Sequence, residues 1–145
     1  PSRNQSIMEF AEFKTKSGKF GYRITVDHYK DRMATVLRRG WTEDEGQQKP
    51  HHFNAPVDVT DDQLKELTVE VKREKQHPDG SVSYYWHRPG NAPNELSDLL
   101  NYGSAMVEII AWQICTRQFG MDDVEWSGFW DFVEDSANNA QYGRI

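Results

Sequence analysis

One apolar-rich segment dominates the sequence, APNELSDLLNYGSAMVEIIAW at residues 92–112. Its apolar residues recur at helical spacing, so the segment predicts a long helix over about residues 94–118. We expect one wide face of this helix to be its core face, formed by Leu96, Leu99, Leu100, Gly103, Met106, Val107, Ile110 and Ile114. The segment is therefore expected to supply the core of the domain.

Two acidic residues, Glu95 and Asp98, stand at the front end of the predicted helix. Asp98 points nearly opposite the core face and begins a second stripe that continues through Ala105, Ile109 and Trp112, so we expect partial shielding from solvent. Acidic residues are common in a first helical turn because the helix dipole and the free N–H groups stabilise them. The alternative is a metal site, in which carboxylate oxygens hold Mg²⁺ or Mn²⁺. Spacing alone leaves both interpretations open.

The rest of the chain mixes strand and helix patterns. Aromatic and β-branched residues predict strands over residues 19–26 and 81–88 and a possible edge strand over 51–57, and residues 1–18 predict a short helix or a strand. The tetrapeptide HPDG before the second of these strands is typical of a turn. Strands and helices in alternation favour an α/β layered domain.

Two further helices are marked by their start signals. Asp27 is expected to cap a helix over residues 28–39, which ends at Gly40. Thr60 and Gln63 form a capping box, which predicts a helix from residue 61. Leu64, Leu67 and Val71 would then line one face of this second helix.

Length and charge limit the remaining possibilities. A chain of 145 residues suffices for one domain with a single core, and no uninterrupted apolar run approaches the roughly 18 residues that a membrane span requires. The single cysteine, Cys115, excludes an internal disulfide and fits a reducing compartment. The formal net charge of −6 is uneven: residues 1–118 carry −1 and residues 119–145 carry −5. This balance argues against a chain built mainly as a non-specific DNA binder.

Three ordered motifs resemble the large terminase subunit of tailed bacteriophages, in particular its lambda-like group. YRITVDHYKDRM is similar to a strand followed by an Asp-x-x-Lys helix in that family, and HHFNAPVDVTDDQLKELTVE is similar to its His-Phe-Pro element and acidic helix start. WHRPGNAPNELSDLLNYGSAMVEII resembles its Asn-Glu-x-x-Asp helix. The matches cover about residues 20–115. They depart from the family pattern at the inserted Asn54 and at Ser97.

The resemblance implies a nuclease with an RNase H-like fold, of which residues 1–118 would be the C-terminal part. In that family, acidic residues from separate elements hold two metal ions, Mg²⁺ or Mn²⁺, which drive hydrolysis of the DNA backbone. Asp98 matches the last acidic position of the family motif, and Glu95 matches its companion. The earlier acidic positions would lie on upstream strands, so we expect this chain alone to be incomplete as an enzyme.

The resemblance also implies a function and partners. The expected activity is metal-dependent cutting of concatemeric viral DNA by a packaging terminase in the host cytoplasm, with the capsid portal and the small terminase subunit as protein partners. Lys30, Arg32, Arg38 and Arg39 would face double-stranded DNA, although a solvated helix face explains the same residues equally well. The alternative function is a non-catalytic docking module that binds the portal or another packaging subunit.

The acidic tail, residues 119–145, is expected to be distinct from the nuclease region. Its aromatic residues Trp126, Phe129 and Trp130, followed by Val133, fall at the spacing of one helix face. Large aromatics seldom stay exposed, which favours a helix that folds back on the domain. Docking to a partner such as the portal is the alternative.

Other candidate residues are weaker. His51 and His52 are expected at a strand end, because neither has metal-ligand partners at suitable spacing. Asp27 is the reserve carboxylate for a metal, and Cys115 is expected to be a small core or flanking residue.

Overall fold

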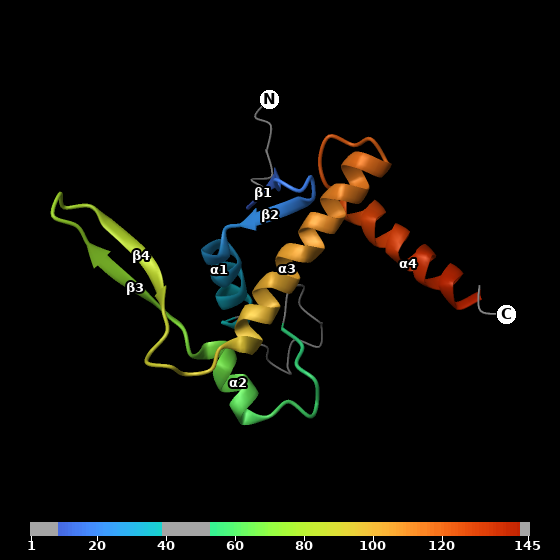
Figure 1. Cartoon of the computed structure of the whole chain (residues 1–145). Coiled ribbons are helices and arrows are strands. Elements are labelled where there is room, and N and C mark those ends of the chain that lie inside the picture. The colour runs from blue at the N-terminus through green and yellow to red at the C-terminus, as the bar shows by residue number, and fades with distance from the viewer. Residues whose placement is uncertain (1–8, 39–52, 143–145) are drawn as a thin grey trace. The chain divides into compact units, whose positions relative to one another are not determined.

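The computed structural model describes residues 9–38 and 53–142 and shows helices mixed with small two-stranded sheets (Figure 1). The expected helix end at Gly40 and the residues Arg39, His51 and His52 lie outside the described ranges. The chain divides into two compact units. We call residues 24–104 the central unit and residues 1–23 with 105–145 the terminal unit.

The central unit begins with helix α1, Val26–Leu37. Thr25 precedes its first turn without a side-chain cap, and Asp27 lies inside that turn. The prediction that Asp27 caps the helix is therefore wrong, although the residue still benefits from the helix dipole. Tyr29 is the buried residue of α1 and is 1% exposed.

Helix α2, Asp61–Thr68, confirms the predicted capping box. The backbone N–H of Gln63 donates to Thr60 Oγ1 over 3.3 Å, and the N–H of Thr60 donates to Gln63 Oε1 over 2.9 Å. Leu67 is buried on the inner side of this helix. The edge strand predicted over 51–57 is absent from its described part, residues 53–57.

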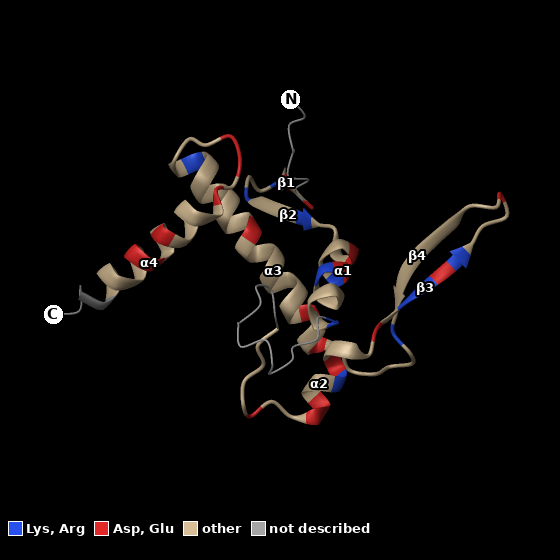
Figure 2. Cartoon of the chain, turned by 180° about the vertical axis from the view of Figure 1, so that it is seen from behind, with Lys and Arg blue, Asp and Glu red and all other residues tan. Residues whose placement is uncertain are grey.

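A β-hairpin follows α2, and it shows where the helix prediction was wrong. Strand β3, Val71–Gln76, pairs antiparallel with β4, Val82–His87, although Val71 was expected to continue the helix. Pairing with β4 overrides the local helix propensity of this segment. In the pair, Lys72 lies opposite Trp86. Along β3, the acidic Glu74 stands between basic residues, Lys72 and Arg73 before it and Lys75 after it, as Figure 2 shows.

The predicted HPDG turn joins the two strands of the hairpin. Gly80 has φ +82°, a left-handed conformation that favours glycine. Asp79 accepts hydrogen bonds from the backbone N–H of Ser81 over 2.9 Å and from its hydroxyl over 2.7 Å. These bonds lower the pKa of Asp79, because they stabilise the charged carboxylate.

The long predicted helix is present as α3, Glu95–Gln113, followed by a π-helical turn, Ile114–Gln118. The expected core face is wrong, because Leu99 is 68% exposed and Met106 is 60% exposed. The buried residues are smaller or polar: Asn94, just before the helix, and then Ser97, Asn101, Ala105, Ala111 and Cys115. The helix is apolar on several sides, so hydrophobic period alone does not select a face. The face that packs is the one with small side chains, because small side chains allow close approach of neighbouring elements.

The terminal unit has its own small core. Ala111 and Cys115 pack against Phe129, with Ile114 and Val124 at the edge. Phe129 belongs to helix α4, Trp126–Tyr142, so the predicted fold-back of the tail is confirmed within this unit. Trp126, Trp130 and Val133 remain substantially exposed. Cys115 is buried, as expected for a small core residue.

Strands β1, Phe10–Lys14, and β2, Phe20–Ile24, form the second two-stranded sheet. Glu12 of β1 accepts hydrogen bonds from Tyr22 and from Arg117. The bond to Glu12 raises the pKa of Arg117 above its already high value, so the guanidinium stays charged. These contacts join the sheet to the π-helical turn after α3 inside the terminal unit.

Candidate active site

The first turn of α3 is held by hydrogen bonds to the residue just before the helix and to helix α2. Asn94 directly precedes the first helical residue, and its carbonyl oxygen accepts from the N–H of Asp98 over 3.0 Å. Glu66 of α2 accepts from the backbone N–H of Leu96 over 3.0 Å. One of the unpaired N–H groups of the first turn is thereby satisfied by a carboxylate. The geometry of the first turn is consequently determined by α2 as well as by α3.

The two predicted carboxylates both lie in this first turn. Glu95 is exposed and Asp98 is half-buried, so Asp98 is shielded as expected. Their spacing of three residues places them on neighbouring positions of one helix side. Asp98 Oδ2 accepts a hydrogen bond from Asn94 Nδ2 over 3.1 Å.

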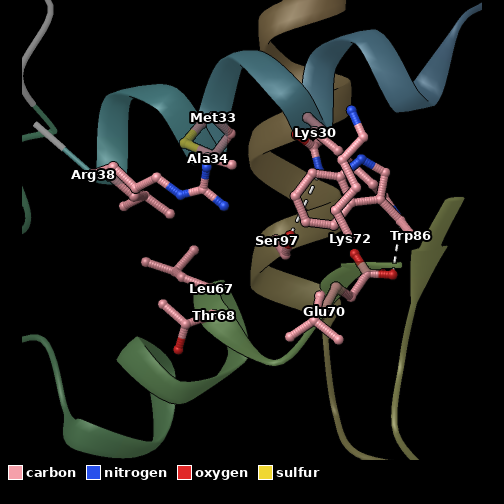
Figure 3. Close-up of a pocket in the computed structure, with 13 residues that line it drawn as sticks. Lys30, Met33, Ala34, Arg38, Leu67, Thr68, Glu70, Lys72, Trp86 and Ser97 are labelled. Carbon is pink, nitrogen blue, oxygen red and sulfur yellow. Dashed lines mark hydrogen bonds and ion pairs between the residues drawn. The ribbon is translucent and has the colours of Figure 1, made fainter. Parts of the chain in front are cut away.

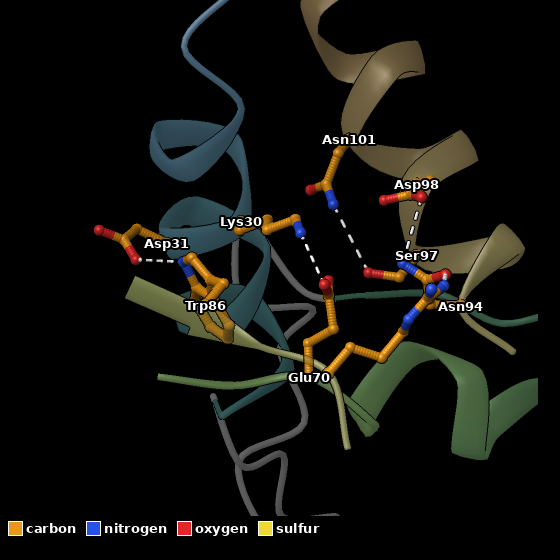
Figure 4. A network of polar contacts seen from close by, with 9 residues as sticks. Lys30, Asp31, Glu70, Trp86, Asn94, Ser97, Asp98 and Asn101 are labelled. Carbon is orange, nitrogen blue, oxygen red and sulfur yellow. Dashed lines mark hydrogen bonds and ion pairs between the residues drawn. The ribbon is translucent and has the colours of Figure 1, made fainter. Parts of the chain in front are cut away.

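A short relay of hydrogen bonds orients Asp98 (Figure 4). The guanidinium of Arg88 donates to Asn94 Oδ1, and the other end of the same amide donates to Asp98. Asn94 is buried, with 6% exposed, which limits its freedom to rotate. Metal-binding carboxylates in proteins are usually held by such hydrogen bonds from neighbouring groups.

Nothing in the sequence indicated a role for Arg88 or Glu66, and Asn94 entered only as the first residue of the Asn-Glu-x-x-Asp motif. Asn94 carried a usable signal, since asparagine is a preferred residue directly before a helix and Asp98 stands four residues later. Arg88 and Glu66 carried no local signal, because the tertiary fold brings them to the start of α3.

The donor set at the start of α3 suits a hard divalent cation in chemistry, since carboxylate oxygens are the ligands that Mg²⁺ and Mn²⁺ prefer. Asn94 engages Oδ2 of Asp98, and the exposed Glu95 adds a second carboxylate. Within residues 9–38 and 53–142, no group of three or more His, Cys, Asp or Glu side chains is placed to hold a metal ion. The reserve carboxylate, Asp27, is exposed in the first turn of α1.

The predicted DNA-contacting residues fall into different environments. Lys30 forms a 2.7 Å ion pair with Glu70, and its side chain is only 13% exposed. Arg32 is exposed, and its guanidinium lies 5.9 Å from the ring centroid of Tyr29. Arg38 is exposed near the end of α1 and lines the same cavity as Lys30. Arg39 lies outside the described residues.

No helix in the described part of the chain is both long and apolar enough to cross a membrane.

Comparison with known proteins gives one family. The family model described as terminase large subunit gpA, endonuclease domain, matches residues 8–118, which is well over half of the chain. No curated protein and no solved structure matches. The match includes α1, α2, the β3–β4 hairpin and α3, and it therefore contains the whole arrangement around Asp98.

Proposed function

This chain belongs to the family of terminase large subunit endonuclease domains, and we propose from that premise that Asp98 is a metal ligand of the nuclease site. Membership implies a nuclease that acts on DNA as part of a packaging terminase. The observation that supports the role of Asp98 is the relay from Arg88 through Asn94, which orients its carboxylate. The relay does not extend to Glu95, which is exposed and would be the more mobile ligand.

The proposed cofactor is Mg²⁺ or Mn²⁺, held by Asp98 and Glu95 together with carboxylates outside this pair. When bound, two such ions activate the attacking water and stabilise the leaving oxygen of the DNA backbone. Asp98 contributes a carboxylate of set orientation, because Asn94 donates to one of its oxygens. Two carboxylates leave most coordination positions unfilled, so this chain alone is expected to cut DNA poorly.

The remaining parts of the proposal follow from the resemblance found in the sequence. The described helices and small sheets would be the C-terminal portion of an RNase H-like domain, and the substrate would be concatemeric viral DNA in the host cytoplasm. Arg32 of α1 and Arg38, which directly follows that helix, are exposed cations that would contact DNA phosphates. Lys30 would act differently, because Glu70 already neutralises it.

A docking role is supported by a separate observation in the tail. Trp126 is 41% exposed and Trp130 is 53% exposed on α4, while Phe129 anchors the same helix in the terminal unit. Large exposed aromatics with acidic neighbours suit a protein partner. The proposed partners are the capsid portal and the small terminase subunit.

Cleavage by the full terminase large subunit tests the metal role. Asp98→Asn keeps the size of the side chain and its ability to accept from Asn94, but removes the charge that a metal requires. We expect loss of DNA cleavage with an unchanged thermal transition, and a smaller loss for Glu95→Gln. The matched control is Asp135→Asn on α4, which should cut like the wild type. Wild-type cleavage by Asp98→Asn would contradict the proposal.

A further inference from the structure

A cavity of about 320 Å³ lies in the central unit, beside the start of α3. Its walls come from α1, α2, the hairpin and α3 (Figure 3). The volume is at the lower end of the range for small-molecule sites. Neither Asp98 nor Glu95 lines it, so the cavity is separate from the proposed metal ligands.

Two hydrogen-bond acceptors in the lining are buried without a partner, Glu70 Oε2 and Asn101 Oδ1. Glu70 uses its other oxygen for Lys30, and its side chain is 10% exposed. Asn101 is 1% exposed and uses its amide nitrogen in a 3.5 Å contact with Ser97 Oγ. Figure 4 shows that Lys30 and Glu70 point toward one another, and that Asn101 and Ser97 lie along the same side of α3. Buried acceptors of this kind cost free energy unless a donor reaches them, so Glu70 Oε2 and Asn101 Oδ1 are the atoms of the lining at which an N–H or O–H group would be stabilised.

The charges of the lining restrict the kind of donor. The lining contains three cations, Lys30, Arg38 and Lys72, and one carboxylate, Glu70. Asp31 pairs with Lys72 from outside the lining at 2.6 Å, which still leaves an excess of positive charge. A cationic donor such as an arginine side chain would meet net repulsion. A neutral donor group attached to an anion satisfies both the acceptors and the surrounding cations.

The other walls of the cavity are apolar and broad. They are formed by Met33, Ala34, Leu37, Leu67, Val71 and the indole of Trp86. Trp86 is held in place, because its indole N–H donates to Asp31 over 3.1 Å. Apolar and aromatic walls with a few polar groups suit a flat heterocycle, and base stacking on aromatic side chains is a common mode of binding unpaired nucleotides.

We propose that this cavity binds one unpaired nucleotide of the DNA substrate, through a base that carries an amino group. The amino group donates to Asn101 Oδ1 and Glu70 Oε2, the ring lies against the apolar walls, and the phosphate faces Arg38 at the rim. The inference rests on the proposed function, because DNA is considered as the ligand only if the domain is a DNA nuclease. It goes further by giving the central unit a preference for cytosine or adenine next to the cleavage site. Ser97 and Asp98 are adjacent on α3, so the same helical turn would serve both sites.

Binding of free nucleotides to the whole chain, without added metal, tests this proposal. The two pairs dCMP with dUMP and dAMP with dIMP are nearly matched in size. Within each pair the amino group, which has two N–H donors, is replaced by a carbonyl oxygen, and the adjacent ring nitrogen changes from an acceptor to a single N–H donor. In at least one pair, the amino-bearing nucleotide should bind about tenfold tighter, since a hydrogen bond to a charged or buried acceptor contributes roughly that factor. Titration is followed by calorimetry and by the indole N–H resonance of Trp86. Equal affinity within both pairs, or no binding at all, would overturn the proposal.

Two variants separate binding from folding. Asn101→Leu keeps a similar volume and removes the acceptor, so it should abolish the preference for the amino group without lowering the melting temperature. Arg38→Gln changes an exposed rim residue and should weaken dCMP binding severalfold, while deoxycytidine, which has no phosphate, should be unaffected. Asn138→Leu, an exposed position of α4, is the matched control and should bind like the wild type. An unchanged preference in Asn101→Leu, or an equal effect of Arg38→Gln on nucleotide and nucleoside, would contradict the assignment.

Three further outcomes are informative. Binding of N-acetyl-arginine amide in place of the nucleotides would show that the cavity receives a protein side chain, and it would overturn the proposal. The nucleotide-binding result and the cleavage result test the cavity proposal and the metal role separately. Metal-dependent cleavage that requires Asp98, combined with no nucleotide binding, removes only the cavity proposal. Nucleotide binding combined with cleavage by Asp98→Asn removes only the metal role.

Discussion

Breaking the buried ion pair between Lys30 and Glu70 should strongly destabilise the central unit. The two side chains are 13% and 10% exposed, and Lys30 Nζ lies 2.7 Å from Glu70 Oε1. Glu70 Oε2 already has no partner. Lys30→Met would leave the whole carboxylate buried and unpaired. Removing one partner of a buried pair costs about 3–5 kcal/mol, a large share of the roughly 5–15 kcal/mol that stabilises a typical domain.

The chain offers a matched control for this substitution. Lys65 pairs with Asp62 at 2.9 Å, but these side chains are 75% and 89% exposed. Lys65→Met should therefore cost no more than about 1 kcal/mol, because water already screens the pair. Both variants remove one lysine and introduce the same apolar side chain, so the difference between them measures burial.

Urea unfolding, followed by circular dichroism, supplies the free energies. A second substitution completes the test: Lys30→Met with Glu70→Met replaces the pair by apolar groups and should recover most of the loss. A cost for Lys30→Met below about 1 kcal/mol, as in the control, would refute the reasoning. Additive effects of the two substitutions would do the same, since residues in contact should couple.

Three further predictions address other parts of the fold. Phe129→Ala removes the 3% exposed anchor of the terminal core and should cost about 3–5 kcal/mol in urea unfolding; a loss below about 1 kcal/mol would show that α4 is not anchored there. Thr60→Ala breaks the capping box with Gln63 and should cost about 1 kcal/mol, measured by thermal melting, and no loss would remove the box as a source of stability. Ser81→Ala should raise the pKa of Asp79 toward its ordinary value, because the main bond that lowers it is lost. In the wild type, the stabilisation from that turn is present above the ordinary pKa of Asp79 and disappears as pH falls through the lowered value; an NMR titration that gives the same pKa for both proteins would contradict this.

The sequence predicted the parts of this chain whose signals are local. The capping box of Thr60 and Gln63 and the HPDG turn each depend on a few neighbouring residues, and both are present. The start of α3 was also predicted closely, at about residue 94, and the helix begins at Glu95. Local chemistry was sufficient in these cases.

The failures come from tertiary contacts. Val71 was predicted to continue α2, yet its segment pairs with β4, and no helical period can anticipate a strand partner. Leu99 and Met106 were predicted to be buried, yet small residues such as Ala105 and Ala111 form the packed side of α3. Hydrophobic period identifies a helix more reliably than it identifies the face that packs when apolar residues surround the axis.

The candidate site shows the same division. Asp98 and Glu95 were found from the sequence, and the structure places both in the first turn of α3. Their roles as metal ligands remain predictions. Arg88 and Glu66 could not be found from the sequence. Arg88 is separated from α3 by a loop, and Glu66 belongs to α2. The groups that orient a carboxylate are set by the fold and seldom by sequence spacing.

Paramagnetic broadening by Mn²⁺ tests the central proposal most directly, since it reports metal binding without requiring cleavage. In ¹H–¹⁵N spectra of the whole chain, Mn²⁺ should first broaden the amide resonances of Glu95 and Asp98 and of their helical neighbours. Mg²⁺ in excess should reverse the effect, and Asp98→Asn should abolish it at the same Mn²⁺ concentration. Uniform broadening over all acidic segments, including α4, or unchanged broadening at the start of α3 in Asp98→Asn, would contradict the assignment of Asp98 as a metal ligand.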